Sequence, residues 1–202
     1  MSERSTRDNA QPDGVQIVND DAQYRFDDDD LGAGPEWGTP SYIWEPLSDA
    51  VGGFDLDPAS GAESEPIAAD RIAIEDNGLT AEWYGDVWTN PPYSRDHNPI
   101  WAEKIAYEAT RSEVNSITAL VVASTSSKWF QDHYTKADYL TLIDHRIRFE
   151  SDDSYAGASF DNVIVSFGSF GRRYISALEE LGTIYRPAYN RSSLCTGSDR
   201  DE

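Results

Sequence analysis

Residues 86–93 read Asp-Val-Trp-Thr-Asn-Pro-Pro-Tyr, an apolar run that ends in an amide, two prolines and an aromatic ring. We predict that the run is a strand and that the four residues after it hold a planar base with an exocyclic amino group. Asn90 offers a side-chain carbonyl as a hydrogen-bond acceptor, and Pro91 keeps its carbonyl free as a second acceptor. Pro92 fixes the turn, and Tyr93 provides a ring face on which the base can stack.

This turn predicts chemistry at an amino group. Two acceptors aimed at one NH2 draw proton density from the nitrogen, so that its lone pair can attack an electrophilic methyl group. No covalent enzyme nucleophile is needed, which agrees with a chain whose single cysteine, Cys195, lies in a polar C-terminal stretch. Two other interpretations stay open at this point, a rigid strand end without chemistry and a proline-rich ligand motif.

The sequence around this turn predicts the fold class. Short apolar runs alternate with helical patterns, which is typical of an α/β fold with a mostly parallel sheet and flanking helices. Predicted strands lie near residues 54–56, 71–74, 86–89, 117–122, 139–143 and 162–167, and predicted helices cover 39–50, 99–111, 128–135 and 173–181. Thr39 is predicted to cap the first helix, with Pro40 in its first turn.

The domain organisation follows from composition. Residues 1–33 are polar and contain the run Asp27–Asp30, so we expect a disordered acidic tail without a metal site. Residues 34–187 are expected to form one domain, and 188–202 a polar C-terminal tail.

The charge is strongly acidic and unevenly distributed. The net charge is -21, and the chain holds 3 lysines beside 13 arginines. Residues 1–94 carry 4 basic and 21 acidic residues, whereas 95–202 carry 12 and 16. A nucleic-acid enzyme is normally basic. A halophilic surface explains scarce lysine and abundant aspartate best, and an acidic DNA mimic or solvated tails are the alternatives. If a phosphate backbone docks, it docks on the second half.

Several classes of protein are excluded or disfavoured. No run approaches the roughly 18 apolar residues of a membrane span, and no signal segment is present. One cysteine excludes a disulfide framework and favours a cytoplasmic location. The three histidines have no metal-ligand spacing, so we predict no metal site. The oligomeric state stays open.

Two acidic turns are candidates for cofactor binding. The segment from Phe54 to Gly61 is a predicted strand followed by Asp57-Pro58-Ala59-Ser60, and carboxylates at strand ends can receive an ammonium or ribose hydroxyl group. Asp76-Asn77-Gly78-Leu79 follows the next predicted strand and could contact adenine or ribose. The first segment is equally compatible with an ordinary turn, and in isolation the second is better explained as an ordinary Asn-Gly turn.

The order of these motifs resembles the phage-type DNA N6-adenine methyltransferase (Dam) family. The likeness runs from about Trp37 to Gly168. Its motifs are Trp37-x-Thr39-Pro40, Asp57-Pro58-Ala59, Asp76-Asn77-Gly78-Leu79, Asn90-Pro91-Pro92-Tyr93, Trp101-x-x-Lys104, Ser126–Phe130, Arg146–Phe149 and the closing strand 160–167. Ala59-Ser60 replaces the usual cysteine, and Ser124 replaces a usual arginine, which affects the phosphate contacts expected of that loop.

The resemblance implies a Rossmann-like fold that uses S-adenosyl-L-methionine to methylate N6 of adenine in DNA. It implies that Asn90, Pro91, Pro92 and Tyr93 hold the flipped adenine. Cofactor contacts would come from Thr39, Pro40, Asp57, Pro58 and Asp76. The substrate-binding candidates are Lys128, Arg146 and Arg148.

Target recognition is expected to be short or relaxed. Only 33 residues separate the cofactor turn at Asp57 from Asn90, which leaves no room for a recognition domain between them. The stretch 146–161 is therefore the candidate for target contacts. Alternatives are the same chemistry on cytosine N4, an RNA base or protein glutamine, and a non-enzymatic acidic DNA mimic. Protection from restriction and epigenetic marking are both compatible roles.

Overall fold

A computed structural model describes residues 38–61, 66–73, 76–149 and 160–188. In this part of the chain seven strands form one sheet in the order β2-β1-β3-β4-β6-β5-β7. The elements are α1 (Ser41–Val51), β1 (Phe54–Asp57), β2 (Ala68–Arg71), β3 (Gly85–Thr89), α2 (His97–Glu108), β4 (Val114–Val122), α3 (Lys128–His133), the 3-10 turn η3 (Tyr134–Lys136), β5 (Tyr139–Ile143), β6 (Asn162–Gly168), α4 (Arg172–Leu181) and β7 (Gly182–Tyr185).

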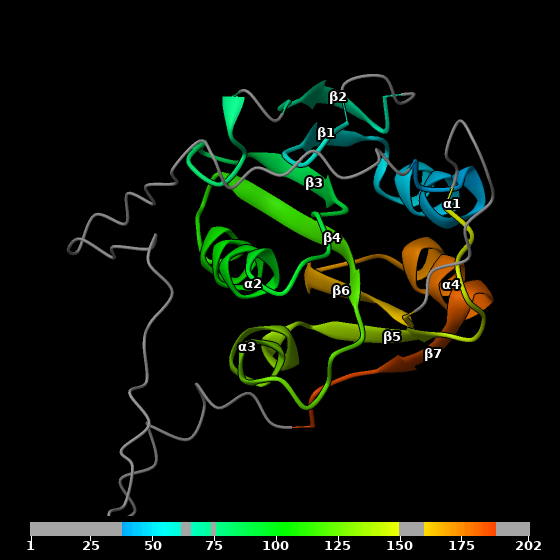
Figure 1. Ribbon diagram of the computed structural model, residues 1–202. Coiled ribbons are helices and arrows are strands. Elements are labelled where there is room, and N and C mark those ends of the chain that lie inside the picture. The colour runs from blue at the N-terminus through cyan, green and yellow to red at the C-terminus, as the bar shows by residue number, and fades with distance from the viewer. Residues whose placement is uncertain (1–37, 62–65, 74–75, 150–159, 189–202) are drawn as a thin grey trace, which may run out of the picture. The chain divides into compact units, whose positions relative to one another are not determined.

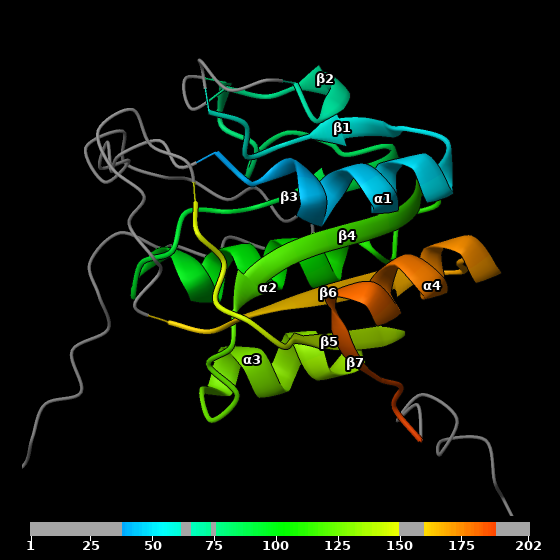
Figure 2. The ribbon, with the colours of Figure 1, turned by 90° about the vertical axis from the view of Figure 1, so that its right-hand side faces the viewer.

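The helices cover the two faces of the sheet in pairs. Helices α1 and α4 pack together on one face, and α2 and α3 pack together on the other (Figure 1). Figure 2 shows the first pair in front of the strands. The prediction of an α/β fold with flanking helices is confirmed.

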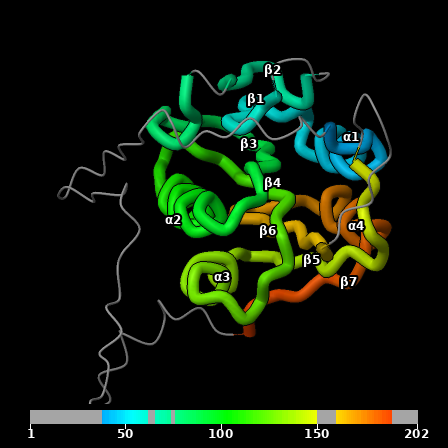
Figure 3. Tube along the Cα trace, in the orientation of Figure 1, coloured from blue at the N-terminus to red at the C-terminus, as the bar shows by residue number. Residues whose placement is uncertain are grey.

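The sheet is mixed because its last two strands in the chain are reversed. Neighbours β2, β1, β3 and β4 pair in parallel, whereas β4 with β6, β6 with β5, and β5 with β7 pair antiparallel. Five strands therefore share one direction, while β6 and β7 run against them. Figure 3 follows the chain through these elements from blue to red. The expectation of a mostly parallel sheet holds for the pairing of β1 to β4, whereas β5 has only antiparallel neighbours.

The core lies between the sheet and the helices. Strands β4 and β6 are almost wholly buried, because both faces are covered, and they are accordingly rich in β-branched residues. On α4 the buried residues Tyr174, Ala177, Leu178 and Leu181 recur at helical spacing and form one apolar stripe. They join α1 in a cluster that also contains Trp88 of β3 and Leu120 of β4.

Three local predictions were wrong. Strand β2 begins at Ala68, three residues before the predicted strand at 71–74. Strand β7 was not predicted, because it has four residues and follows α4 without a loop. Thr39 does not cap α1: the cap position is occupied by Pro40, and no side chain caps this end.

The predicted tails, residues 1–33 and 188–202, lie outside the described residues except for Ala188. None of the helices in the described ranges is long and apolar enough to cross a membrane.

Candidate active site at the carboxyl edge of the sheet

The carboxyl ends of the parallel strands bring polar residues together. Asp57 is the last residue of β1, and Asn90 directly follows the neighbouring strand β3. Asn162 begins the reversed strand β6 and pairs with Val122 at the end of β4, so it comes to the same edge. Ligands of open α/β sheets bind at this edge. The arrangement is therefore the candidate site.

The Asn90 side chain is held at both ends. Its Nδ2 donates to Thr39 Oγ1 over 3.0 Å, and its Oδ1 accepts from the Tyr93 hydroxyl over 2.5 Å. The next residue, Pro91, is buried, whereas Pro92 is exposed. An amide oxygen has two lone pairs, so Asn90 Oδ1 can accept a second hydrogen bond. The structure thus joins Thr39, which the sequence placed with the cofactor, to the proposed catalytic turn.

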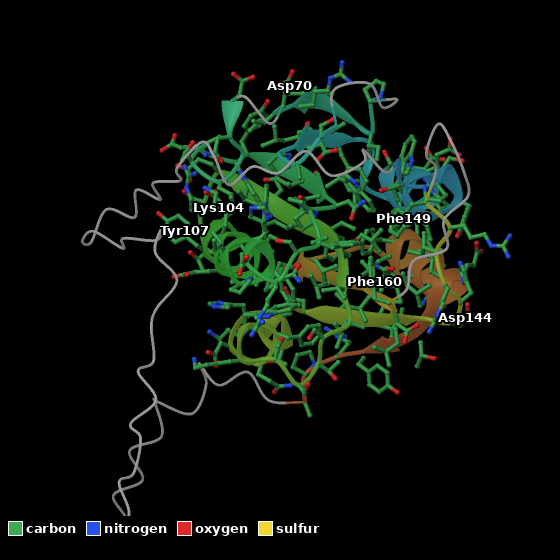
Figure 4. All side chains as sticks on the ribbon, in the orientation of Figure 1. Asp70, Lys104, Tyr107, Asp144, Phe149 and Phe160 are labelled. Atoms are coloured by element: carbon green, nitrogen blue, oxygen red, sulfur yellow. The ribbon has the colours of Figure 1, made fainter. Side chains whose placement is uncertain are left out.

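Tyr93 directs its hydroxyl into the protein. The hydroxyl also lies 3.0 Å from the Leu120 carbonyl oxygen and 3.1 Å from Asn162 Nδ2, which donates to it. The half-buried ring meets Phe149 and Phe160 edge-on, with centroids 6.1 and 5.1 Å away. Figure 4 labels both phenylalanines, on the side of the sheet that α1 and α4 cover. Burial raises the pKa of Tyr93 well above its usual value, so the phenol stays neutral.

Asp57 is a buried carboxyl group. It is 5% exposed, and its Oδ1 accepts a hydrogen bond from the Ala59 N–H over 3.1 Å. Burial raises the pKa of Asp57 to about 7, against the lowering effect of that hydrogen bond. A buried acid with a raised pKa in a ligand-binding edge is typical of a functional site, because a bound cation can ionise it.

The two predicted cofactor turns touch each other. A Cβ on Gly78 would lie 1.8 Å from the Pro58 carbonyl oxygen, so only glycine allows this approach. Asn77 has a left-handed backbone with φ 51, and its Oδ1 accepts from the Leu79 N–H. Asp76 is exposed at the outer end of the turn. Segments 57–58 and 76–78 are therefore in contact at Pro58 and Gly78, and we call the two segments together the Asp57 wall.

Buried charges on α2 hold this wall in place. Trp83 Nε1 donates to the Gly78 carbonyl oxygen over 2.8 Å and its ring lies 6.2 Å from that of Trp101. Lys104 Nζ donates to the Ala81 carbonyl oxygen over 2.7 Å and to Glu108 Oε1 over 2.5 Å. Desolvation lowers the pKa of Lys104, against the raising effect of Glu108. The Trp101-x-x-Lys104 motif thus has a supporting role.

The basic candidates lie apart from this hydrogen-bonded group. Lys128, 88% exposed, begins α3 and pairs with Asp132 of the same helix. Arg146 is paired with Asp161 over 3.3 Å, and both side chains are largely exposed. Arg148 is exposed, while its neighbours Ile147 and Phe149 are buried. The arginines are thus connected to the site through Phe149, which packs on Tyr93.

Sequence reasoning missed Asn162 and Leu120 as parts of the site, and it included Phe149 and Phe160 only within the stretch 146–161 of expected target contacts. A polar residue at the start of a predicted strand was the available signal for Asn162. In a parallel strand, however, that residue would lie at the opposite edge from Asn90. Within the described ranges, no group of three or more His, Cys, Asp or Glu residues could hold a metal ion.

The family model for DNA N-6-adenine-methyltransferase (Dam) matches residues 30–193. A curated relative, the DNA N-6-adenine-methyltransferase of Escherichia phage T1, is 29% identical over 111 residues. This match covers 54% of the present chain and 44% of the relative, so the chain spans less than half the length of that protein.

Proposed function

The chain belongs to the DNA N-6-adenine-methyltransferase (Dam) family, and we propose that it methylates the N6 amino group of adenine in DNA with S-adenosyl-L-methionine as donor. We further propose that residues 34–187 form a Rossmann-like methyltransferase domain. The observation that carries the proposal is the Asn90 amide, fixed between Thr39 and Tyr93 at the carboxyl edge.

Asn90 and Pro91 form the acceptor side of the mechanism. Asn90 Oδ1 and the Pro91 carbonyl oxygen accept the two hydrogens of the adenine amino group. The nitrogen lone pair then points away from the protein acceptors and is free to attack. Because Thr39 and Tyr93 fix the amide beforehand, the acceptors need little reorganisation during the reaction. Pro92 keeps the turn rigid.

The target base has to leave the duplex to reach this turn. Unpairing and unstacking cost a few kcal/mol, which new stacking and hydrogen bonds offset. The partly exposed Tyr93 ring, braced by Phe149 and Phe160, provides the stacking surface.

The residues along the Asp57 wall suit the methyl donor. S-adenosyl-L-methionine carries an ammonium group, a sulfonium centre and ribose hydroxyls, and when bound it supplies the electrophilic methyl group. Asp57, buried and with a pKa near 7, ionises opposite a positive group. The exposed carboxylate of Asp76 accepts from hydroxyl or amino groups. The remaining contacts to the methyl donor come from Thr39, Pro40 and Pro58.

DNA docks through the arginine-bearing second half of the chain. Lys128, Arg146 and Arg148 are exposed and contact phosphates. The acidic first half, with 4 basic and 21 acidic residues in positions 1–94, is adapted to concentrated salt, in which carboxylates keep the surface hydrated and their mutual repulsion is screened. Recognition is short or relaxed, in a restriction-modification system or an epigenetic role.

The direct test is mass spectrometry of nucleosides from DNA incubated with the protein and S-adenosyl-L-methionine in molar KCl. N6-methyladenine is the expected product. Asn90→Ala should lower the rate roughly 10²–10³-fold, as does loss of a preorganised acceptor elsewhere, without loss of cofactor affinity. The control is Asn115→Ala, which removes an exposed amide near the opposite end of β4. Wild-type turnover in Asn90→Ala would refute the assigned role.

The same assay separates the alternatives. N4-methylcytosine, a methylated RNA base or methylated glutamine would each identify a different acceptor for the same chemistry. An acidic DNA mimic, with which the net charge of -21 is also compatible, has no use for a methyl donor. Failure of the wild-type protein to bind S-adenosyl-L-methionine or its demethylated product in molar salt would support the mimic.

A further inference from the structure

The Tyr93 hydroxyl has more hydrogen-bond partners than it has hydrogens. Asn90 Oδ1 lies 2.5 Å from it and the Leu120 carbonyl oxygen 3.0 Å, and both are acceptors. The third partner, Asn162 Nδ2 at 3.1 Å, is a donor. A hydroxyl has one hydrogen and two lone pairs. The single hydrogen must therefore serve either Asn90 or Leu120, while Asn162 occupies a lone pair.

Asn162 is held in the orientation that makes it a donor. It is 3% exposed, and its Nδ2 also approaches the Val121 carbonyl oxygen at 3.4 Å. Its Oδ1 is buried and accepts no hydrogen bond from any described residue. An orphaned acceptor is unfavourable, so the amide is kept this way round by the two acceptors facing its nitrogen.

We propose that Asn162 is a positioning residue that acts on Asn90 through the Tyr93 hydroxyl. When the target amino group binds, this hydroxyl turns its hydrogen from Asn90 Oδ1 to the Leu120 carbonyl oxygen. The inference rests on the proposed function. Without substrate, the hydrogen satisfies Asn90 Oδ1 and fixes the amide. With substrate, Asn90 Oδ1 becomes free to accept from the amino group at full strength.

The heavy atoms need not move for this exchange. Leu120 O already lies within hydrogen-bond distance of the hydroxyl, and the donor from Asn162 prevents the hydrogen from turning toward β6. The raised pKa of Tyr93 agrees with a phenol that keeps its hydrogen throughout, but the proposal stands on the three contacts. The topology supplies them, since β6 is reversed and places its first residue beside the end of β4.

A double-mutant cycle tests the connection. Asn162→Leu removes the donor, and Tyr93→Phe removes the hydroxyl while keeping the ring. Each is expected to lower kcat about tenfold, the scale of one lost hydrogen bond. Because Asn162 acts through the hydroxyl, the double variant should be no slower than Tyr93→Phe alone. Effects on kcat that multiply would overturn the proposal.

A pH profile of activity distinguishes the positioning role of Asn162 from a packing defect. In Asn162→Asp, an ionised carboxylate accepts from Tyr93 and draws its hydrogen away from both Asn90 and Leu120. A protonated carboxylic acid can donate to Tyr93 as the amide does. Activity of Asn162→Asp relative to wild type should therefore recover as pH falls, whereas that of Asn162→Leu should not. Equal profiles for the two variants would count against the proposal.

The control is Thr141→Val on the neighbouring strand β5. Its hydroxyl is also buried and also makes no hydrogen bond to the described residues, yet it lies outside the site. Activity should stay at the wild-type level. Cofactor binding, measured by calorimetry for every variant, identifies those that are folded. A wild-type protein that methylates no amino group would refute the proposed function. An active wild-type protein whose two substitutions have multiplicative effects on kcat would refute this inference alone.

Discussion

Asp57→Asn should stabilise the protein in the absence of cofactor. The Asp57 carboxyl is almost fully buried, and its pKa rises from 3.8 to about 7 on folding. Between these two values the folded state binds a proton that the unfolded state has lost, so the free energy of unfolding falls as pH rises from about 4 to 7. At about 1.4 kcal/mol per unit, the shift corresponds to roughly 4 kcal/mol above pH 7.

Asparagine removes this cost while keeping the local contact. An amide oxygen at position 57 can still accept from the Ala59 N–H. We therefore expect Asp57→Asn to be more stable than wild type by up to about 4 kcal/mol at pH 8, but by only about 1 kcal/mol at pH 4.5. Its affinity for S-adenosyl-L-methionine should fall, because the neutral amide cannot balance a positive group.

Urea unfolding in molar KCl, followed by tryptophan fluorescence at pH 4.5 and pH 8, measures this difference. Asp49→Asn is the matched control, since it removes one negative charge from an exposed position on α1. The control should change stability little at either pH. If Asp57→Asn is no more stable than Asp49→Asn at pH 8, burial of an ionised Asp57 is not a cost and the reasoning fails.

Three further predictions concern binding and salt. Gly78→Ala should weaken S-adenosyl-L-methionine binding in calorimetry, because its Cβ would meet the Pro58 carbonyl oxygen. Gly171→Ala, whose Cβ would have no atom within 4 Å, should bind the donor as wild type does, and equal affinities of the two variants would contradict a role of the Pro58–Gly78 contact in donor binding. Arg146→Ala combined with Arg148→Ala should weaken DNA binding in fluorescence anisotropy and leave cofactor affinity unchanged, and unaltered DNA affinity would remove both residues from the interface. Methylation should rise with KCl, peak in the molar range and be poor near ~0.1 M, since screening of carboxylate repulsion opposes the usual loss of DNA binding with salt; a rate that is highest at low salt and declines steadily would contradict halophilic adaptation.

The sequence predicted the family and the general fold, because both depend on local patterns. Apolar runs of the right length identified β1, β3, β4, β5 and β6, and the Asn90–Tyr93 motif pointed to the edge where the polar residues gather. The family prediction is confirmed by the match over residues 30–193. The individual roles of the site residues remain predictions.

The connections inside the site depend on tertiary structure. Thr39 and Asn90 are 51 positions apart, and no local pattern shows that their side chains share a hydrogen bond. Asn162 was predicted to begin a strand, but only the reversal of that strand places it beside Tyr93. Strand direction is set by how the chain returns to the sheet, which periodicity does not encode. The motif indicates the Tyr93 ring as a stacking surface, whereas Leu120 and Asn162, which contact its hydroxyl, come from β4 and β6 and are brought there only by the fold.

The Tyr93 ring contacts both Phe149 and Phe160, and this has a consequence for how the chain between them can vary in length. They stand immediately before and after residues 150–159, so both ends of that stretch are tied to one side chain of the site. The entropy of closing a chain between two fixed points rises by only about 0.6 kcal/mol for each doubling of the connecting length. The position of the Tyr93 ring, which Phe149 and Phe160 fix from both sides, therefore depends little on how many residues separate these two phenylalanines.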